Sequence, residues 1–489
     1  MTSEQGRPSR GAYLIKGGAV ITVDPKIGTL PKADVLVRDG AIVNVGADLA
    51  ADGAEVIDAS RMIVMPGFVD SHYHMWSTLG RNFLSDNGFE YFPAKWATSE
   101  LYDAPDFHNS VTLGLAELAN SGVTTVNNWS HNNRSPGHVD AELSAHKSSL
   151  LRARYSIGHI DRLPPDVVNT FDDLDRVQQE WFADGAKLDG LVHLGVNLRG
   201  MVQSDARVFH EEMQVMLRRG LPVCIHASQT RPNSDDAADY ERRGYLGSRF
   251  LFCHYVAATD SDRAAMARTK TSLSFSTHSE LRLGEHGDPR VALLKARAAG
   301  VSVTLSSDAT SIAPPNMFEN MRFTWNMAIP WKETETEDLP PLGFHEAIEM
   351  ATINGARALG LDHITGSLTP GKRADIILIR TDDLNIAPLA NIETSVVLSA
   401  TPANVDTVMV DGRVLKRNGR LLHCDVPGIV ERAEKSARRI RAAAGGILKP
   451  VSEAPGNPVF AAACLTMQRA APARATPSAY WRCREIRRS

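Results

Sequence analysis

Short apolar runs alternate with helical segments through the middle of the chain. The first of them, residues 62–69, leads into His72 and His74. Seven further strands are predicted at 124–129, 154–159, 191–198, 222–226, 250–254, 272–277 and 301–306. Helices are predicted between them, for example at 108–120, 209–219 and 291–298. Strands that alternate with helices pair in parallel through right-handed crossovers, and eight such units close a barrel.

An open, doubly wound sheet is the alternative arrangement for this pattern. Such sheets carry a glycine-rich phosphate-binding turn after a strand, and no predicted strand is followed by one. The pattern therefore predicts an α/β fold with a TIM-like (β/α)8 barrel over residues 63–366. The segment 345–361 has good helix propensity and is predicted as one helix that ends at Gly360.

Runs rich in β-branched residues mark both ends of the chain. They cover residues 12–23, 33–46, 374–380 and 405–421. Turn residues of hairpins, among them Asp39-Gly40 and Asp411-Gly412, interrupt them. Neither end has enough strands to bury a face alone, so we expect residues 12–62 and 367–425 to form one composite β-sandwich. Residues 450–489 are rich in Ala, Pro and Arg without periodicity, which predicts a disordered tail or, alternatively, an arm around a neighbouring subunit.

Composition narrows the class of protein. Of the 489 residues, 43% are hydrophobic and 22% charged, which is ordinary for a soluble globular protein. The net charge of −4 gives no sign of a nucleic-acid partner. There is no apolar stretch long enough for a membrane span and no signal-peptide core at the start. The five scattered cysteines lack CxxC spacing, so we expect a reduced, cytoplasmic protein. A small-molecule substrate and a homo-oligomeric state are further expectations.

Histidines recur where predicted barrel strands end. His72 and His74 lie on one face of a strand, because side chains alternate, while His226, His254 and Asp308 end three other strands. The strand ends of such a barrel open onto one mouth, so these side chains should converge. Three imidazoles and a carboxylate are the ligand set of a hydrolytic metal centre that leaves room for water. An isolated His-x-His is as often a pair of ordinary polar residues, but the whole set favours a metal site.

These residues, together with the motifs GFVDSHYH, EMATINGARALGL and GSLTPGKRADIILI, resemble the amidohydrolase superfamily. They closely resemble its aminohydrolase branch, which includes cytosine and guanine deaminases and triazine hydrolases, and the likeness covers roughly residues 12–425. The resemblance implies one divalent metal ion, zinc or alternatively iron or manganese, held by His72, His74, His226 and Asp308. It also implies that His254 orients the attacking water or polarises the scissile group, and that Asp308 takes the proton of the water. Strand four ends GVNLR, without the Lys that forms a metal-bridging carbamate in other branches.

One position departs from the deaminase pattern. Deaminases of this branch carry His-x-x-Glu, whereas here His226 is followed by Gln229 at that spacing. A neutral amide has no proton to give at pH 7. Either another carboxylate serves as the acid, with Glu280 after strand seven as the candidate, or the leaving group departs as a stable anion and needs no acid.

The sequence therefore predicts a hydrolase that replaces chloride, nitro or amino on a nitrogen heteroaromatic ring by hydroxyl, through a metal-bound hydroxide. Triazine chlorohydrolase and 2-nitroimidazole nitrohydrolase are similar enzymes with anionic leaving groups. The alternatives are a conventional heterocycle deaminase that uses Glu280 as acid, a hydrolase of amide or urea C–N bonds, and a non-catalytic relative that only binds a ligand.

Five other residues are candidates for contact with the substrate. They follow or end predicted strands, or lie in the loop after His74: Arg199, His131, His278, Trp76 and Trp129. The arginine could bind an electronegative ring atom and the tryptophans could stack on a flat ring. The alternatives are a structural salt bridge for Arg199 and ordinary packing for the aromatic residues.

Overall fold

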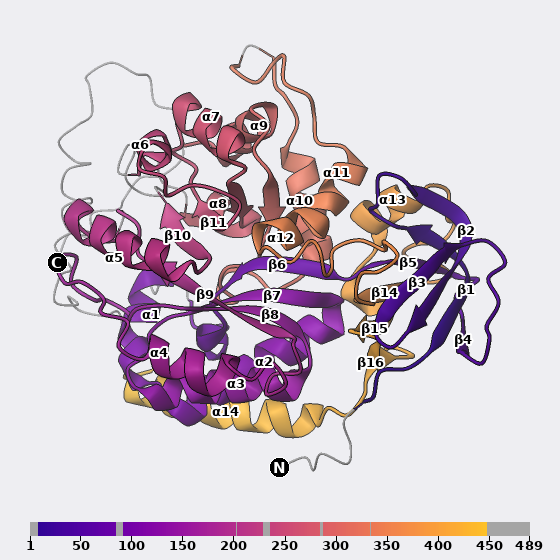
Figure 1. Ribbon diagram of the computed structural model, residues 1–489, viewed down its shortest axis with the longest axis horizontal. Helices are drawn as coiled ribbons and strands as arrows, with labels where there is room; N and C mark the ends of the chain where they lie inside the picture. The colour runs from indigo at the N-terminus through magenta and orange to yellow at the C-terminus, as the bar shows by residue number, and fades with distance from the viewer. Residues whose placement is uncertain are drawn as a thin grey trace, which may run out of the picture. The chain divides into compact units, whose positions relative to one another are not determined.

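The computed structural model describes residues 8–84, 91–201, 203–227, 235–283, 287–332 and 334–446 (Figure 1). Two predictions, the role of Gln229 and the tail at 450–489, lie outside these ranges. None of the helices within them combines the length and the apolar character needed to cross a membrane.

A parallel sheet forms the centre of the described chain. Its eight strands run in chain order from one edge to the other. They are β6 (Phe68–Tyr73), β7 (Val123–Ser130), β8 (Arg152–Ile157), β9 (Val192–Leu198), β10 (Val223–Ala227), β11 (Phe250–His254), β12 (Ser272–Phe275) and β13 (Val303–Leu305). A bridge between Tyr73 and Asp308 joins the two edges. This arrangement confirms the predicted TIM-like barrel.

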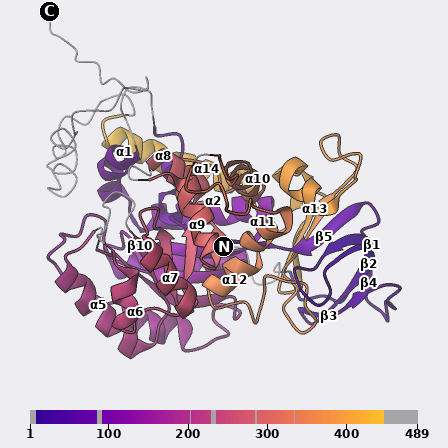
Figure 2. The same cartoon turned by 90° about the horizontal axis from the view of Figure 1, so that it is seen from above.

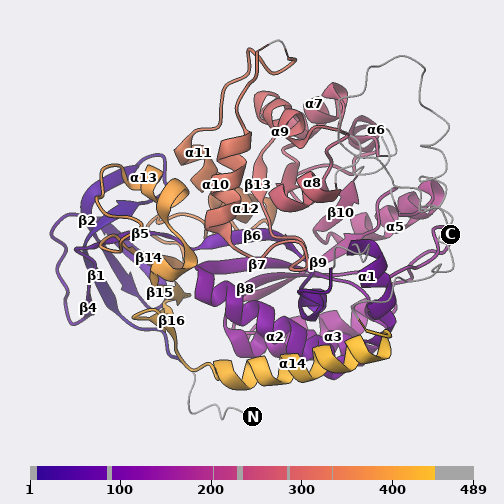
Figure 3. The ribbon, with the colours of Figure 1, turned by 180° about the vertical axis from the view of Figure 1, so that it is seen from behind.

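Helices cover the outside of the barrel. They include α2 (Ala104–Ser121), α3 (Pro136–Ser149), α5 (Ala206–Arg219), α7 (Asp260–Thr269), α9 (Pro289–Ala298) and α10 (Met317–Met327). Among them, α2, α5 and α9 correspond to the predicted segments 108–120, 209–219 and 291–298. A capping box starts α2, in which the side chains of Asp103 and Asp106 each accept the other's backbone N–H. Gly122 ends it with φ of 91°. A further helix, α14 (Val426–Ala443), packs along α2 (Figure 3).

The predicted helix over 345–361 is wrong as a single element. The chain forms α11 (Phe344–Met350) and α12 (Ile353–Ala358), separated at Ala351 and Thr352. The carbonyl of Ala351 accepts the backbone N–H of Val69 in β6, at 2.8 Å. This carbonyl is therefore bonded to the barrel and not to the next turn of a helix. After this break α12 packs on inward-facing side chains and closes the barrel at the end where its strands begin.

Both chain ends build a second sheet, as predicted. In the described ranges it has nine strands: β1 (Tyr13–Ile21), β2 (Thr29–Arg38), β3 (Ala41–Gly46), β4 (Glu55–Asp58), β5 (Met62–Pro66), β14 (Ile376–Arg380), β15 (Val405–Val410), β16 (Arg413–Arg417) and β17 (Arg420–Leu421). The join lies at β5, which pairs in parallel with β1 and antiparallel with β14. Buried residues from both ends share one hydrophobic core. Figure 2 shows β1 to β5 grouped at one side of the barrel.

The chain passes from this sheet to the barrel at Gly67. The apolar run at 62–69, predicted as one strand, is thus divided between β5 and β6. A Cβ atom at Gly67 would lie 2.1 Å from the side chain of Thr124, so only glycine allows this close approach.

A buried ion pair links barrel and sheet. Arg152, the first residue of β8, donates from Nε to Asp375 at 2.7 Å, and both side chains are at most 2% exposed. The same carboxylate accepts the backbone N–H of Asp411 at 2.8 Å, just after β15. Asp411 in turn accepts from Arg10 and Arg373. Burial by itself would raise the pKa of Asp411, but the guanidinium groups of Arg10 and Arg373 hold this pKa below its ordinary value.

Arg152→Met is expected to lower the free energy of unfolding by about 3–5 kcal/mol, because it leaves Asp375 as an uncompensated buried charge. Urea unfolding followed by circular dichroism measures the change. The matched control is Arg61→Met, which removes an exposed pair with Asp382 and should cost less than about 1 kcal/mol. Equal, small losses in both variants would show that the pair does not hold barrel and sheet together.

Candidate metal centre

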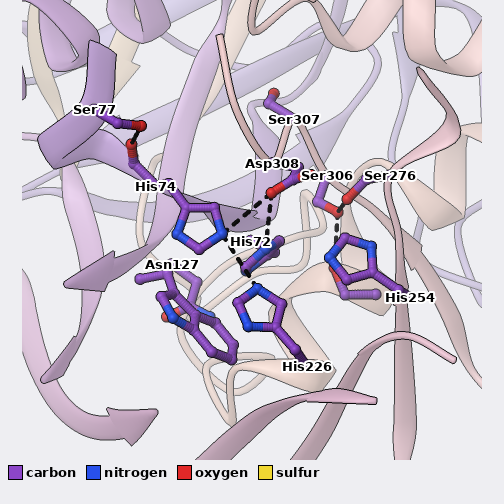
Figure 4. A network of polar contacts seen from close by, with 12 residues as sticks. His72, His74, Ser77, Asn127, His226, His254, Ser276, Ser306, Ser307 and Asp308 are labelled. Carbon is purple, nitrogen blue, oxygen red and sulfur yellow. Dashed lines mark hydrogen bonds and ion pairs between the residues drawn. The ribbon is translucent and has the colours of Figure 1, made fainter. Parts of the chain in front are cut away.

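The strand ends bring the four predicted histidines and the aspartate together. His72 belongs to β6 and His74 follows it, His226 and His254 belong to β10 and β11, and Asp308 follows β13. Figure 4 shows the side chains of His72, His74, His226 and Asp308 pointing at one another, with His254 beside them. All but His226 are almost completely buried.

The distances within the cluster fit a single cation. Nε2 of His72 and Nε2 of His74 each lie 3.2 Å from Oδ1 of Asp308. Nε2 of His74 also lies 3.2 Å from Nε2 of His226. Tetrahedral ligands at zinc-like bond lengths are about 3.3 Å apart, so these spacings are those of atoms around one ion.

Hydrogen bonding gives a second test of this fit. Among the described residues, neither ring nitrogen of His72 makes a hydrogen bond, although Nε2 lies 3.2 Å from the carboxylate of Asp308. Buried nitrogens normally have partners, and a cation would take up such a lone pair. Two overlapping groups, His72 with His226 and His254, and His72 with His74 and Asp308, have ligand atoms close enough to hold a metal.

Burial sets the charges of these residues. It lowers the pKa of His72, His74 and His226, so these imidazoles are neutral near pH 7. Burial alone would raise the pKa of Asp308, but contacts with His72 and His74 hold it well below its ordinary value. Neutral imidazole and carboxylate are the forms that bind divalent metals.

The backbone at two of these residues is strained. His254 has φ of 75° and Asp308 has φ of 59°, in the left-handed region that costs a non-glycine residue about 1–3 kcal/mol. Asp308 is held there by two backbone bonds of 2.8 Å, from its N–H to the carbonyl of His72 and from the N–H of His74 to its carbonyl. The closure of the barrel therefore fixes the aspartate against both histidines.

His254 forms a buried pair with Glu280 of α8 (Thr277–Leu283). Its Nδ1 lies 3.0 Å from Oε1 of Glu280, which also accepts the backbone N–H of Ser276 at 3.0 Å. Burial lowers the pKa of His254, but the carboxylates of Glu280 and Asp308 outweigh it and raise this pKa to about 9. Glu280 is therefore the partner of Nδ1 of His254.

The family model that describes amidohydrolases matches residues 63–415 of this chain. The chain belongs to the amidohydrolase family. As a member it is a hydrolase, and the enzymes of this family depend on divalent metal ions. Its barrel and its strand-end histidines are the parts that the match covers.

Curated relatives of this amidohydrolase are similar over nearly their whole length. A 5-methylthioadenosine/S-adenosylhomocysteine deaminase of Desulforudis audaxviator is 30% identical over 446 residues, covering 87% of this chain and 98% of the relative. A 5'-deoxyadenosine deaminase of Methanosarcina acetivorans is 27% identical over 443 residues, covering 88% and 99%.

Solved structures share the fold. An adenosine deaminase from Xanthomonas campestris with bound zinc superposes with a TM-score of 0.75 at 21% identity, covering 89% of this amidohydrolase and 100% of that chain. An atrazine chlorohydrolase from Arthrobacter aurescens TC1, complexed with zinc, gives 0.74 at 21% identity, covering 87% and 100%.

Three of the candidate substrate residues pack against the histidine cluster. Nδ1 of His131 lies 3.3 Å from Nδ1 of His74, and the indole N–H of Trp76 donates to Nδ1 of His131 at 2.9 Å. The ring of Trp129 lies 4.1 Å from that of His226, measured between centroids. His131 and Trp129 thus contact candidate metal ligands, whereas Trp76 reaches the cluster through His131.

The other two candidates lie elsewhere. Arg199 is 1% exposed and donates to Glu212 at 2.8 Å and to the carbonyl of Pro164 at 2.8 Å, which is the salt bridge that the sequence left as an alternative. His278 lies 3.7 Å from Glu319, and its ring is 5.0 Å from that of Phe323. The structure does not bring Arg199 or His278 into the cluster.

The sequence analysis missed a polar group beside the cluster. Lys95 of α1 (Tyr91–Thr98) lies 2.8 Å from Oδ1 of Asp161, and that oxygen is 3.7 Å from Nε2 of His131. Burial would raise the pKa of Asp161, but Lys95 and His131 lower it far below its ordinary value. The strand-end rule could have found Asp161, which follows β8, whereas no motif marks Lys95.

His74→Ala is expected to lose the bound divalent ion while the protein stays folded, because it removes a nitrogen in contact with both Asp308 and His226. Metal analysis of the purified variant, with circular dichroism as the check on folding, measures this. His345→Ala, at a half-exposed histidine paired with Glu393, is the control and should keep its metal. Full metal occupancy in His74→Ala would remove this residue from the ligand set.

Proposed function

We propose that this amidohydrolase replaces a substituent on a nitrogen heteroaromatic ring by hydroxyl. It would use one divalent ion, for which zinc is the first candidate. His72, His74, His226 and Asp308 would hold the ion. The observation that carries the proposal is the convergence of neutral imidazoles and an ionised Asp308 around one point, next to the buried pair of His254 and Glu280. When bound, the ion supplies Lewis acidity, which makes water a nucleophile near neutral pH.

The residues of the chain provide the proton transfers. Asp308 lies at the centre of the cluster, where its carboxylate can accept the proton of the attacking water. His254 donates from Nδ1 to Glu280, which leaves Nε2 as the atom that faces the reacting ring. Glu280 acts through His254. It orients the imidazole of His254 and balances the positive charge of that imidazole when it is protonated.

An amino group is the first candidate for the leaving group. An amino group must take up a proton to leave as ammonia, and the His254–Glu280 pair provides a buried source of that proton. The named activities of the curated relatives, deamination of 5'-deoxyadenosine, 5-methylthioadenosine and S-adenosylhomocysteine, support this choice and suggest an adenine-like ring.

Chloride or nitro is the second candidate. Gln229 stands where deaminases of the branch carry an acid, and an anionic leaving group would need none.

The proposal also includes a homo-oligomer in a reduced, cytoplasmic setting. Cys224, Cys253 and Cys424 are free thiols, in keeping with that setting.

Release of ammonia, chloride and nitrite by the metal-loaded protein, measured on aminopurine nucleosides, chlorotriazines and nitroimidazoles, distinguishes the two leaving groups. For deamination we expect Glu280→Gln to lower kcat by about 10²- to 10⁴-fold with metal retained, because general acid–base catalysis contributes that much. Glu319→Gln, at a partly exposed carboxylate, is the control and should change kcat little.

An unchanged kcat in Glu280→Gln, together with chloride or nitrite in the product mixture, would establish the anionic leaving group. Turnover of amide or urea substrates alone would overturn the proposal of a heteroaromatic substrate.

A further inference from the structure

We infer that Trp76 and His131 are positioning residues that fix the ring of His74, so that its Nε2 is the atom that binds the metal. This inference rests on the proposed metal centre. It assigns a supporting role to two residues whose position near the mouth had suggested substrate contact.

The first step is the hydrogen bond between Trp76 and His131. An indole N–H can only donate, and it lies 2.9 Å from Nδ1 of His131, so this nitrogen must be an acceptor. The carbonyl of Trp129 lies 3.4 Å from the same nitrogen and could accept from it only if it carried a proton. Two N–H groups would then face each other at 2.9 Å, which excludes that arrangement.

The second step follows for the opposite side of the His131 ring. With Nδ1 as acceptor, the proton of the neutral imidazole lies on Nε2, which faces Oδ1 of Asp161 at 3.7 Å. Asp161 is held by Lys95 at 2.8 Å. This ion pair joins α1, in the loop after β6, to the loop after β8, and so places a negative charge next to the protonated nitrogen of His131.

The third step passes from His131 to His74. Nδ1 of His74 lies 3.3 Å from the same nitrogen of His131. Because that nitrogen carries no proton, this contact is a hydrogen bond only if Nδ1 of His74 carries one, and the two donors, His74 and Trp76, then share one lone pair. The lone pair of His74 is then on Nε2, which lies 3.2 Å from Oδ1 of Asp308 and 3.2 Å from Nε2 of His226. In the metal-bound protein acceptor atoms would then meet at this point, with no proton from His74 between them, and the cation would satisfy them.

The physical reason for such support is general. A histidine that binds a metal through one nitrogen needs a partner for the other, which sets its tautomer and its ring orientation, and loss of that partner typically weakens metal binding by about 10- to 100-fold. In this chain the partner of His74 is the neutral imidazole of His131. The indole of Trp76 can only donate, so it determines which nitrogen of His131 is the acceptor.

Two measurements test this inference, the tautomers of the two histidines and the affinity for zinc. Nitrogen NMR of histidine-labelled protein should show His131 in the Nε2–H form without metal, and His74 in the Nδ1–H form when zinc is bound. In Trp76→Phe, which removes the indole N–H but keeps an aromatic ring, the Nδ1–H form of His131 should appear, because the carbonyl of Trp129 can then accept.

Metal affinity, measured by competition with a chelator for zinc, gives the second readout. We expect a loss of about 10- to 100-fold in His131→Phe, in which Nδ1 of His74 has lost its partner. A smaller loss of about fivefold, the equivalent of one hydrogen bond, is expected in Trp76→Phe. His131→Gln keeps a carbonyl acceptor and should recover part of the affinity.

Trp181→Phe is the matched control, because it removes an indole hydrogen bond to Asp140 at another place and should leave zinc affinity unchanged. His131 found as Nδ1–H in the unsubstituted protein, or unchanged zinc affinity in a folded His131→Phe, would overturn the inference. If the unsubstituted protein binds no divalent ion, the proposed metal centre fails, whereas the NMR measurement still tests the tautomer of His131 independently.

Discussion

Two backbone hydrogen bonds between the first and the last strand ends hold the candidate metal centre together. They tie the backbone of Asp308 to His72 and His74, each at 2.8 Å, and they close the barrel at the same place. Because the carboxylate of Asp308 contacts both imidazoles, the geometry of the centre depends on the seam of the barrel. The left-handed backbone of Asp308 is kept in place by these bonds.

The seam in turn depends on the elements that pack around it. The carbonyl of Ala351 accepts the N–H of Val69, and α12 fills the barrel below the cluster. The second sheet is attached at Gly67, one residue before β6 begins, and the Arg152–Asp375 pair ties β8 to the same sheet. Sheet and barrel therefore share buried polar contacts, which tie both ends of the chain to the barrel.

Burial gives the centre its chemistry. It keeps His72, His74 and His226 neutral, whereas the nearby carboxylates raise the pKa of His254 to about 9. Imidazoles in one cluster can therefore serve different purposes. A neutral imidazole can bind a metal ion, and a charged imidazole can donate a proton. The same low-polarity surroundings make the partner of each ring nitrogen important, because an unpaired buried nitrogen is costly.

The sequence by itself determined the architecture and the main candidate residues. Apolar runs that alternate with helices predict the barrel, and the rule that parallel strand ends meet at one mouth brought His72, His226 and Asp308 together before any contact was known. These features are local in the sequence or follow from the order of the strands. The family resemblance added the role of each residue.

Only the tertiary structure decided the partners of these residues. The helix at 345–361 divides because a strand N–H takes the carbonyl of Ala351, and periodicity records only which side of a segment is apolar. Arg199 pairs with Glu212 across a strand and a helix, and His131 meets both Trp76 and His74 from other strand ends. Such contacts join residues that are distant along the chain, and their hydrogen-bond directions depend on angstrom-scale distances that residue types alone do not specify.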